Sequence, residues 1–312
     1  MREGRMASRV MQVPVKPHKG YILTRAFLLG MGMAQKAREG FADLTVVLPT
    51  YNEVENIQLI VPEVFRLCPG THIVVVDDSS RDGTGAAVSE MMASYPRLRL
   101  IERDISKKGL TASVMEGIDS VETEFFVVMD ADFQHPPASA ENLYWEMRQG
   151  ADLVVGVRHS MGPLRFSRKM ASWGAHKLAS TYLWFRRRPR SADLMSGFFG
   201  GRTEMVREVI QRKGMRFEKK GFKVLFDILK FCPRGTNVRE VGFTFGDRVS
   251  GHSKLSSDIV LSVMRQCGAF GKLAGFSFEF FLINRAGRVL GLLILAAIFA
   301  IALMMGNPPA KP

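Results

Sequence analysis

The sequence predicts an α/β domain with a mainly parallel sheet, followed by helices at a membrane surface and one membrane span. Two observations predict the domain. From residue 44 onward, short runs rich in β-branched residues alternate with segments of helical periodicity, and those runs are almost continuously apolar. Such strands are typical of parallel sheets that helices cover on both faces. A third observation predicts the span, because residues 289–306 are apolar and carry no charge.

The elements of the domain follow in regular alternation. Strands are expected at residues 44–48, 72–76, 98–101, 125–129, 153–157 and 238–244. Helices are expected at residues 54–67, 84–95, 110–120, 139–149, 203–211 and 222–231. Residues 162–190 break the pattern, being rich in Arg, Trp and Phe, and receive no element. Sheets of this kind bind ligands at the carboxyl ends of their strands, so we expect the site at that edge.

Composition limits the class of protein. The 312 residues include 43 Lys and Arg against 30 Asp and Glu, a net charge of +13, and 46% are hydrophobic. This is a globular composition rather than a disordered one. Three cysteines without CxxC spacing exclude a disulfide framework and a zinc ribbon, and favour a reducing compartment. No recognised nucleic-acid module accompanies the basic charge, so no nucleic-acid partner is expected.

Both ends of the chain differ from the domain at residues 44–257. Residues 1–43 form a basic arm that lacks a signal-peptide core. Residues 258–288 alternate phenylalanines with charges, which predicts amphipathic interfacial helices, with a packed helical hairpin as the alternative. Residues 289–306 would reach about 27 Å as a helix and form a transmembrane anchor, with a buried core helix as the alternative. Arg285 and Arg288 precede them, which indicates that the domain is cytoplasmic.

The strongest chemical signal directly follows the expected strand at 125–129. Asp130, Asp132 and Gln134 place two carboxylates and an amide oxygen at alternate positions after a strand end. Oxygen ligands of this kind suit Mg²⁺ or Mn²⁺ and leave positions open for phosphate oxygens. The sequence therefore predicts a site where a divalent cation holds a diphosphate. Helix capping is the structural alternative for a bare DxD pattern.

Two further strand ends carry acids. The first strand leads into residues 49–53 and the second into residues 77–84, with Glu53, Asp77, Asp78 and Asp82 among them. Asp82 and Thr84 are good turn and helix-capping residues. Three acid-bearing ends at one edge would repel one another unless a metal or a hydrogen-bond donor such as a base or ribose lies between them.

At these residues the chain resembles glycosyltransferase family 2 and, within it, the dolichol-phosphate mannosyltransferases. The matching segments read VVLPTYNE (46–53), VVVDDSSRDGT (74–84), KGLTASVMEG (108–117), VVMDADFQHPP (127–137), VGVR (155–158), SRKMASWGA (167–175), DLMSGFFGGR (193–202) and FTFGDRVSGHSKL (243–255). The first four are shared widely among nucleotide-sugar enzymes, whereas the last is selective for transfer to a polyprenyl phosphate. The resemblance implies a glycosyltransferase-A type catalytic domain over residues 44–257.

The resemblance also implies the site residues. Those that would bind the nucleotide are Pro49, Tyr51, Glu53, Val76, Asp78, Asp130 and Ala131. Those that would hold the metal are Asp130, Asp132 and Gln134. Those expected to act in catalysis are Asp132, Arg158, Arg168, Ser172, Arg248 and Lys254. The arginines and the lysine match positions that handle the phosphates of donor and acceptor, a task suited to guanidinium and ammonium groups.

The implied reaction transfers mannose from GDP-mannose to dolichyl or another polyprenyl phosphate, by an inverting displacement that uses Mg²⁺ or Mn²⁺. Two alternatives stay open: a sister enzyme that uses a UDP-sugar such as UDP-glucose, and a catalytically silent nucleotide-binding membrane scaffold. Membrane lipids are expected partners, with the basic run at residues 186–190 at their surface, and no obligatory protein subunit is expected. The expected location is the cytoplasmic face of the endoplasmic reticulum, or of the plasma membrane in a prokaryote.

Overall fold

The structure is a computed structural model that describes residues 40–104, 109–158, 166–218, 224–244 and 266–267. Contacts divide the chain into two units, Met1–Gly40 and Phe41–Pro312, and every element named below lies in the second. The predicted interfacial helices at 258–288, apart from residues 266–267, and the predicted span at 289–306 lie outside the described residues. In the described ranges, no helix has the length and apolar character needed to cross a bilayer.

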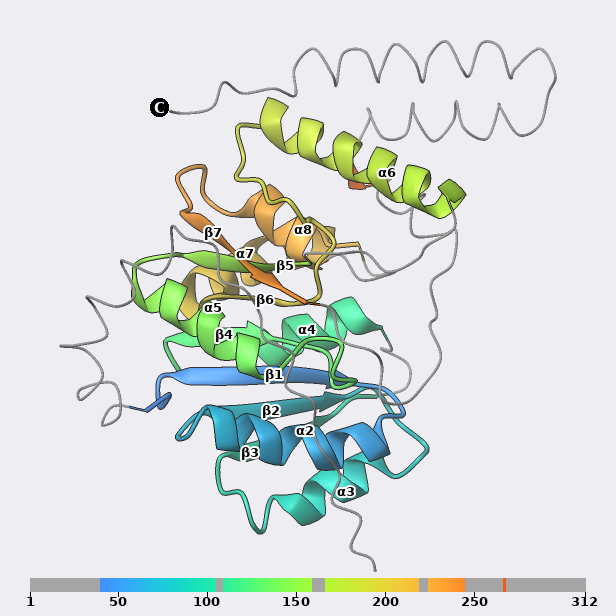
Figure 1. The fold of residues 1–312 in the computed structure, drawn as a ribbon, viewed down its shortest axis with the longest axis vertical. Coiled ribbons are helices and arrows are strands. Elements are labelled where there is room, and N and C mark those ends of the chain that lie inside the picture. Colours follow the sequence, from blue (N-terminus) through green and yellow to red (C-terminus); the bar gives the residue numbers. More distant parts are fainter. Residues whose placement is uncertain (1–39, 105–108, 159–165, 219–223, 245–265, 268–312) are drawn as a thin grey trace, which may run out of the picture. The chain divides into compact units, whose positions relative to one another are not determined.

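A seven-stranded mixed sheet forms the centre of the described domain (Figure 1). Its strands are β1 (Leu44–Thr50), β2 (His72–Asp77), β3 (Leu98–Glu102), β4 (Phe125–Val128), β5 (Leu153–Arg158), β6 (Phe199–Arg202) and β7 (Val238–Phe243), in the order β3-β2-β1-β4-β6-β5-β7. Pairing is parallel from β3 to β4 and between β5 and β7. The expected strands are therefore present, and the sheet is mainly parallel.

Strand β6 is the exception that the sequence analysis missed. It runs antiparallel between β4 and β5. Its sequence FGGR has low strand propensity because glycine adds backbone entropy and no packing side chain. Glycine is nevertheless required there: a Cβ at Gly200 would lie 2.6 Å from the carbonyl oxygen of Phe126, and one at Gly201 would lie 3.0 Å from that of Asp152.

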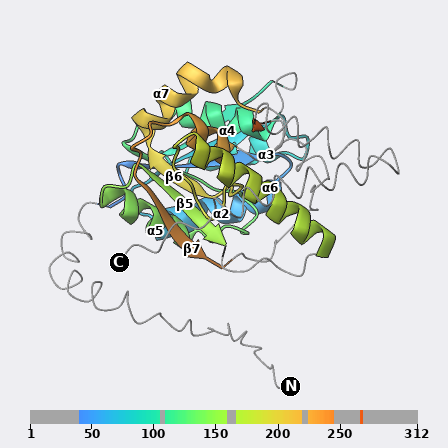
Figure 2. The same cartoon turned by 90° about the horizontal axis from the view of Figure 1, so that it is seen from above.

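Helices cover both faces of the sheet (Figure 2). They are α2 (Val54–Leu67), α3 (Thr84–Met91), α4 (Leu110–Asp119), α5 (Ala138–Arg148), α6 (Phe166–Phe185), α7 (Thr203–Lys213) and α8 (Val224–Phe231), with the short 3-10 helix η2 at Gly214–Arg216. Helices α2, α3 and α5 pack on one face, and α4, α7 and α8 pack on the other. Helix α6 packs on α8 and occupies the segment to which the sequence analysis assigned no element.

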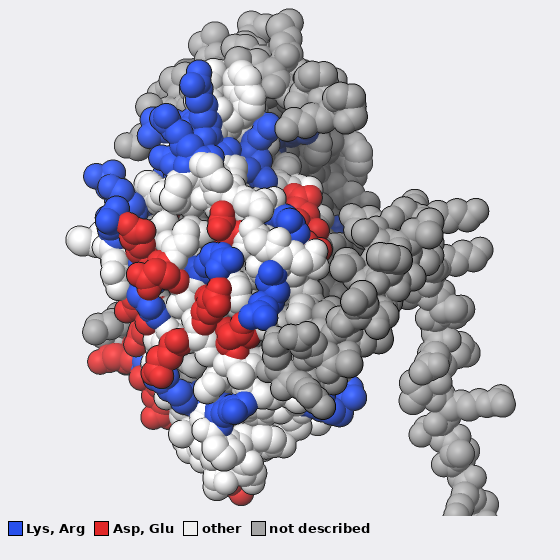
Figure 3. Space-filling model, turned by 90° about the vertical axis from the view of Figure 1, so that its left-hand side faces the viewer, with Lys and Arg blue, Asp and Glu red and all other residues white. Residues whose placement is uncertain are grey.

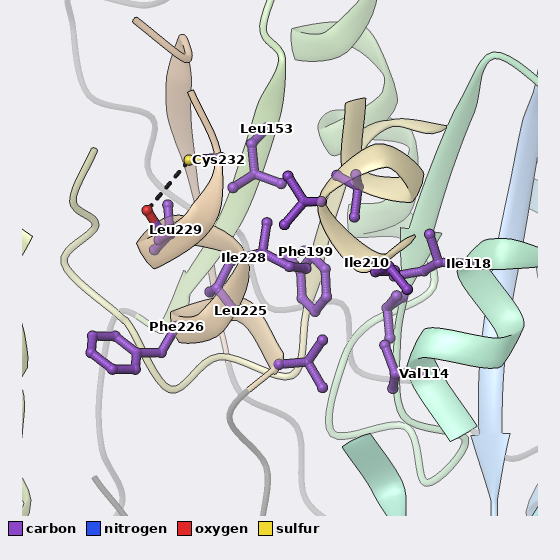
Figure 4. Packing of buried hydrophobic residues seen from close by; sticks show 14 of the residues in the cluster. Val114, Ile118, Leu153, Phe199, Ile210, Leu225, Phe226, Ile228, Leu229 and Cys232 are labelled. Carbon is purple, nitrogen blue, oxygen red and sulfur yellow. Dashed lines mark hydrogen bonds between the residues drawn. The ribbon is translucent and has the colours of Figure 1, made fainter. Parts of the chain in front are cut away.

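The two faces have separate hydrophobic cores. Figure 4 shows the one beneath α4, α7 and α8, where Phe199 of β6 lies among Leu225 and Ile228 of α8. These three side chains are at most 2% exposed, and full burial of such a side chain contributes about 1.5–3 kcal/mol.

All three cysteines are buried and free, as expected from their number, and burial raises the pKa of Cys68 to about 12.

Candidate active site

The carboxyl ends of β1 and β2 are tied into one edge by hydrogen bonds between their loops. The amide of Asp78 donates to the carbonyl oxygen of Thr50 at 2.9 Å. The amide of Asn52 donates to Ser80 Oγ at 2.8 Å, and that of Arg81 donates to Asn52 Oδ1 at 3.0 Å. Since β4 pairs with β1 on its other side, its carboxyl end opens onto the same edge.

Two of the acids at this edge, Asp77 and Asp82, stabilise the loops by accepting hydrogen bonds from them. Asp77 is buried, and its carboxylate accepts hydrogen bonds from Thr50 Oγ1 at 3.0 Å and from the amide and hydroxyl of Ser80 at 2.8 and 2.5 Å. Asp82 accepts from the amides of Val54 and Thr84 at 3.1 and 3.0 Å. Burial opposes ionisation of Asp82, but its hydrogen bonds, led by that from the Thr84 hydroxyl, lower its pKa below the usual value. Both side chains orient neighbouring backbone.

Asp78 is held in a different way. Its Oδ1 accepts from Arg103 Nη1 at 2.5 Å, and its Oδ2 accepts from the amide of Gly109 at 2.7 Å. Arg103 also donates to Glu116 Oε2 at 2.9 Å and to Ser113 Oγ at 3.1 Å. Arg103 could not be predicted from the sequence, because an arginine one position after an edge strand has no spacing that distinguishes it from a surface charge.

Asp130, Asp132 and Gln134 lie in the turn that follows β4. Asp132 is 4% exposed and its Oδ1 accepts from the amide of Gln134 at 3.1 Å. The amide of Asp130 donates to His135 Nδ1 at 3.0 Å, so the proton of the neutral ring lies on Nε2. Burial lowers the pKa of His135 to about 4, and its ring stacks on Phe198 with centroids 5.2 Å apart. His135 is therefore a neutral residue that supports the turn by accepting a hydrogen bond and by packing on Phe198.

Three residues at these strand ends have left-handed backbone. Asn52, Ser79 and Phe133 have φ angles of 56°, 59° and 62°. An L-residue in this region costs roughly 1–2 kcal/mol, and such positions cluster at functional sites. One lies in each of the loops that follow β1, β2 and β4. The three loops are thus held in conformations that local propensity alone does not favour.

The donor set after β4 fits a hard divalent cation. Mg²⁺ is commonly held by one or two carboxylates together with phosphate oxygens and water. Asp130 and Asp132 supply two carboxylates, and Gly197 leaves space beside the first: a Cβ there would lie 3.6 Å from Asp130 Oδ2. The described residues contain no cluster of three or more His, Cys, Asp or Glu side chains arranged as a metal site. Two carboxylates in one turn would leave coordination positions of such a cation open for phosphate oxygens and water.

Arg158 ends β5 and pairs with Asp193. Its Nε donates to Asp193 Oδ2 at 2.8 Å, while Asp193 Oδ1 accepts from the amide of Met195 at 3.2 Å. The side chains are 30% and 12% exposed. Asp193 is the first residue of the DLMSGFFGGR segment (193–202), and no role was predicted for it. The pair joins the end of β5 to the loop before β6, which also carries Gly197.

The remaining predicted site residues differ in how far the structure describes them. Pro49 and Asp130 line a small pocket with Ser196 and Gly197. Glu53 precedes α2 and accepts from Asn56 Nδ2 at 2.6 Å. Tyr51 is half-buried, whereas Val76 and Ala131 are buried. Arg168 and Ser172 lie in α6, but their side chains are outside the description, as are Arg248 and Lys254 entirely.

Comparison with known proteins identifies relatives of this domain. The profile described as "Glycosyl transferase family 2" matches residues 45–210. The chain is 35% identical over 231 residues to a dolichol-phosphate mannosyltransferase of Pyrococcus furiosus, covering 71% of this chain and 62% of that protein's length. It is 34% identical over 231 residues to a polyprenol monophosphomannose synthase of Mycolicibacterium smegmatis, covering 72% and 86%.

A solved structure shares the fold. The chain aligns with glucosyl-3-phosphoglycerate synthase from Mycobacterium tuberculosis, crystallised with Mn²⁺, uridine diphosphate and glucosyl-3-phosphoglycerate, at a TM-score of 0.52 and 18% identity. The alignment covers 81% of this chain and 87% of the other. At this identity the likeness shows the arrangement of helices and strands.

Proposed function

The chain belongs to glycosyltransferase family 2, and on that basis we propose that it transfers mannose to a polyprenyl phosphate. Its fold is the glycosyltransferase-A type that the sequence resemblance implied, with a mixed and mainly parallel sheet. Relatives of the same domain are named dolichol-phosphate mannosyltransferases in an archaeon and in Saccharomyces cerevisiae, the latter 29% identical over 238 residues. The donor in this proposal is GDP-mannose, and the acceptor is dolichyl or another polyprenyl phosphate.

One observation supports this proposal above the others: Asp78 follows β2, the pair Asp130 and Asp132 follows β4, and these two parallel strands flank β1 and end at one sheet edge. In the proposed complex, Asp78 holds the nucleoside together with the loop after β1. Asp130, Asp132 and Gln134 hold the cation on the diphosphate. Mg²⁺ or Mn²⁺ bound there would neutralise the charge that develops on the leaving diphosphate.

The proposed displacement needs little acid–base chemistry from the protein. An oxygen of the acceptor phosphate forms a bond to C1 of mannose, the bond from C1 to the diphosphate oxygen breaks, and GDP leaves with that electron pair. The acceptor monoester is already anionic at neutral pH, so no proton has to be removed from it. What remains is orientation, which Arg158 and the predicted Arg168, Arg248 and Lys254 would supply.

Membrane docking at the end of α6 is part of the proposal. Trp184 and Phe185 are 39% and 51% exposed, with ring centroids 5.2 Å apart, and they adjoin the basic run at residues 186–190. Arg186, Arg187 and Arg190 are exposed. Figure 3 shows Lys and Arg side chains gathered in the upper part of the face that it presents. Aromatic side chains beside arginines suit the interface with anionic headgroups.

The docking proposal places the acceptor phosphate at headgroup level on the cytoplasmic face of the endoplasmic reticulum, or of the plasma membrane in a prokaryote. It is tested with the double variant W184S/F185S of the full chain in liposomes. We expect a several-fold higher KM for long-chain polyprenyl phosphate and an unchanged KM for a short, water-soluble analogue. Met215→Ser is the control, since Met215 is 98% exposed in η2. If W184S/F185S changes the KM by the same factor for both acceptors, or leaves both KM values at the wild-type level, docking at α6 is contradicted.

The activity itself is tested by incubating the full chain in detergent with labelled GDP-mannose or UDP-glucose and polyprenyl phosphate, then extracting into organic solvent. We expect label from GDP-mannose in the organic phase, dependent on Mg²⁺ or Mn²⁺. Asp132→Asn keeps the acceptor for the Gln134 amide but removes a charge, and should lower transfer at least about a hundredfold. Asp119→Asn, on the exposed end of α4, is the matched control.

The same assay separates the alternatives. Label transferred from UDP-glucose and not from GDP-mannose would identify the sister enzyme class. Nucleotide binding without transfer to any prenyl acceptor would favour the silent scaffold. Full activity of Asp132→Asn would remove the cation from the proposed mechanism.

A further inference from the structure

We propose that Arg103 is a positioning residue for nucleotide binding and that it acts through Asp78. The inference rests on the proposed function, in which Asp78 holds the nucleoside. No segment that carries the family resemblance contains Arg103.

Arg103 is an internal charge of the domain. Its side chain is 3% exposed, and the Asp78 side chain is 9% exposed. Its backbone also contacts the end of β2, because its amide donates to the carbonyl oxygen of Asp77 at 2.9 Å and its carbonyl oxygen accepts from Ser79 Oγ at 2.5 Å. A buried arginine that contacts one loop through both backbone and side chain is not a solvated surface charge.

The contacts of Arg103 fix Asp78 from the side of the core. Nη1 reaches Asp78 Oδ1 at 2.5 Å and Ser113 Oγ at 3.1 Å, while Nε is held by Glu116 of α4 at 2.9 Å. The rigid guanidinium plane therefore sets the orientation of the carboxylate.

Asp78 keeps acceptor capacity for a ligand. Each carboxylate oxygen offers two lone pairs, and the hydrogen bonds from Arg103 and Gly109 use one on each oxygen. A carboxylate whose rotamer is already fixed loses less conformational freedom when a nucleoside donor binds to it. Arg103 thus pre-organises an acceptor for the N–H and O–H groups of a nucleoside.

A purely structural role for Arg103 predicts a different result from a positioning role. If the arginine only stabilised the packing of β2, β3 and α4, its loss would weaken every ligand of this edge alike. If it positions Asp78, its loss weakens the binding of a nucleotide but spares pyrophosphate, which has no nucleoside.

The test measures dissociation constants by calorimetry with the full chain in detergent and Mn²⁺, using GDP, UDP and inorganic pyrophosphate as probes. Arg103→Gln should raise the Kd of the bound nucleotide about tenfold, or roughly 1.4 kcal/mol, and leave that of pyrophosphate within about twofold. Arg103→Lys should give an intermediate loss, because an ammonium lacks the planar fork. Arg99→Gln on β3 is the control: Arg99 is exposed and pairs with Glu122 at 2.9 Å.

A double-mutant cycle with Asp78→Asn tests whether Arg103 acts on nucleotide binding through Asp78. In that background, Arg103→Gln should weaken nucleotide binding by less than about threefold. Equal losses of affinity for nucleotide and for pyrophosphate would overturn the inference about Arg103 but not the proposed function. Unchanged nucleotide affinity in both Arg103→Gln and Arg103→Lys would do the same. If Arg103→Gln does not fold, Arg103→Lys decides by the same comparison, the change in the Kd of the nucleotide against the change in the Kd of pyrophosphate. A wild-type chain that binds neither GDP nor UDP would overturn the proposed function and this inference with it.

Discussion

The buried carboxylate of Asp227 should make the folded domain less stable as pH rises. Asp227 lies on α8 and is 0% exposed. Its Oδ2 accepts from the amide of Glu218 at 2.8 Å and from Gln266 Nε2 at 3.0 Å. Its Oδ1 has no hydrogen bond in the described structure, and Lys230 Nζ lies 3.9 Å away. Burial raises the pKa of Asp227 to about 6, against the opposing effects of these hydrogen bonds and of Lys230.

The magnitude follows from the two pKa values of Asp227. The folded value of about 6 exceeds the ordinary value of 3.8, so folding favours the protonated form. The stabilisation is fully present below about pH 4 and is lost as pH rises through about 6. The pKa of Asp227 thus differs by about 2 between the folded and unfolded chain, which corresponds to about 3 kcal/mol in the free energy of unfolding. Asp227→Asn removes this dependence, because an amide keeps the shape of the side chain without its charge.

The assay is thermal unfolding of the full chain in detergent from about pH 4 to about pH 8. The Tm of Asp227→Asn minus that of the wild type should grow by roughly 6–12 °C across this range for a domain of this size. Asp119→Asn, at the exposed end of α4, should give a flat difference. Parallel curves for the wild type and Asp227→Asn would refute the assignment of a raised pKa to this buried group.

Two further predictions concern the sheet and the pair at the end of β5. Gly200→Ala places a Cβ 2.6 Å from the Phe126 carbonyl oxygen and should lower stability by about 1–3 kcal/mol in thermal unfolding, whereas Gly235→Ala, with nothing within 4 Å, should leave Tm unchanged. Equal Tm values for both variants would contradict the close fit of β6. Asp193→Asn weakens the 2.8 Å contact to Arg158 and should lower transfer to polyprenyl phosphate about tenfold with a nearly unchanged Tm. Wild-type transfer would show that Arg158 needs no such orientation.

Much of the fold could be predicted because, in its first half, the local sequence patterns agree with the helices and strands that form. Helix α2 has the expected bounds, and the strands from β1 to β5 differ from expectation by two residues at most. Strand β6 could not be predicted, because it exists through hydrogen bonds to β4 and β5 that the FGGR sequence does not encode locally. Helix α6 was missed because its mixture of basic and aromatic residues gives no single apolar face.

The location of the candidate site followed from topology, but the partner of each acid did not. Parallel neighbours end on the same edge, so acids after β1, β2 and β4 could be assigned to one place. Asp77 and Asp78 are adjacent in sequence, yet the first accepts from Thr50 and Ser80 and the second from Arg103. Both carboxylates are buried, and the partner of Asp78 is Arg103, 25 positions later, which no local pattern around Asp78 predicts.

The role of Arg103 also changes the argument for a bound cation. Repulsion among three acid-bearing strand ends was a reason to expect a metal, base or ribose between them. The structure supplies an internal positive charge at Asp78, so repulsion at that strand end gives no support to a metal. Support for the metal therefore comes from Asp130 and Asp132, which lie in the turn after β4, with Gly197 beside the Asp130 carboxylate. Nucleoside and diphosphate would then be recognised by two separately compensated acid groups, one paired with a fixed arginine and the other with an exchangeable cation.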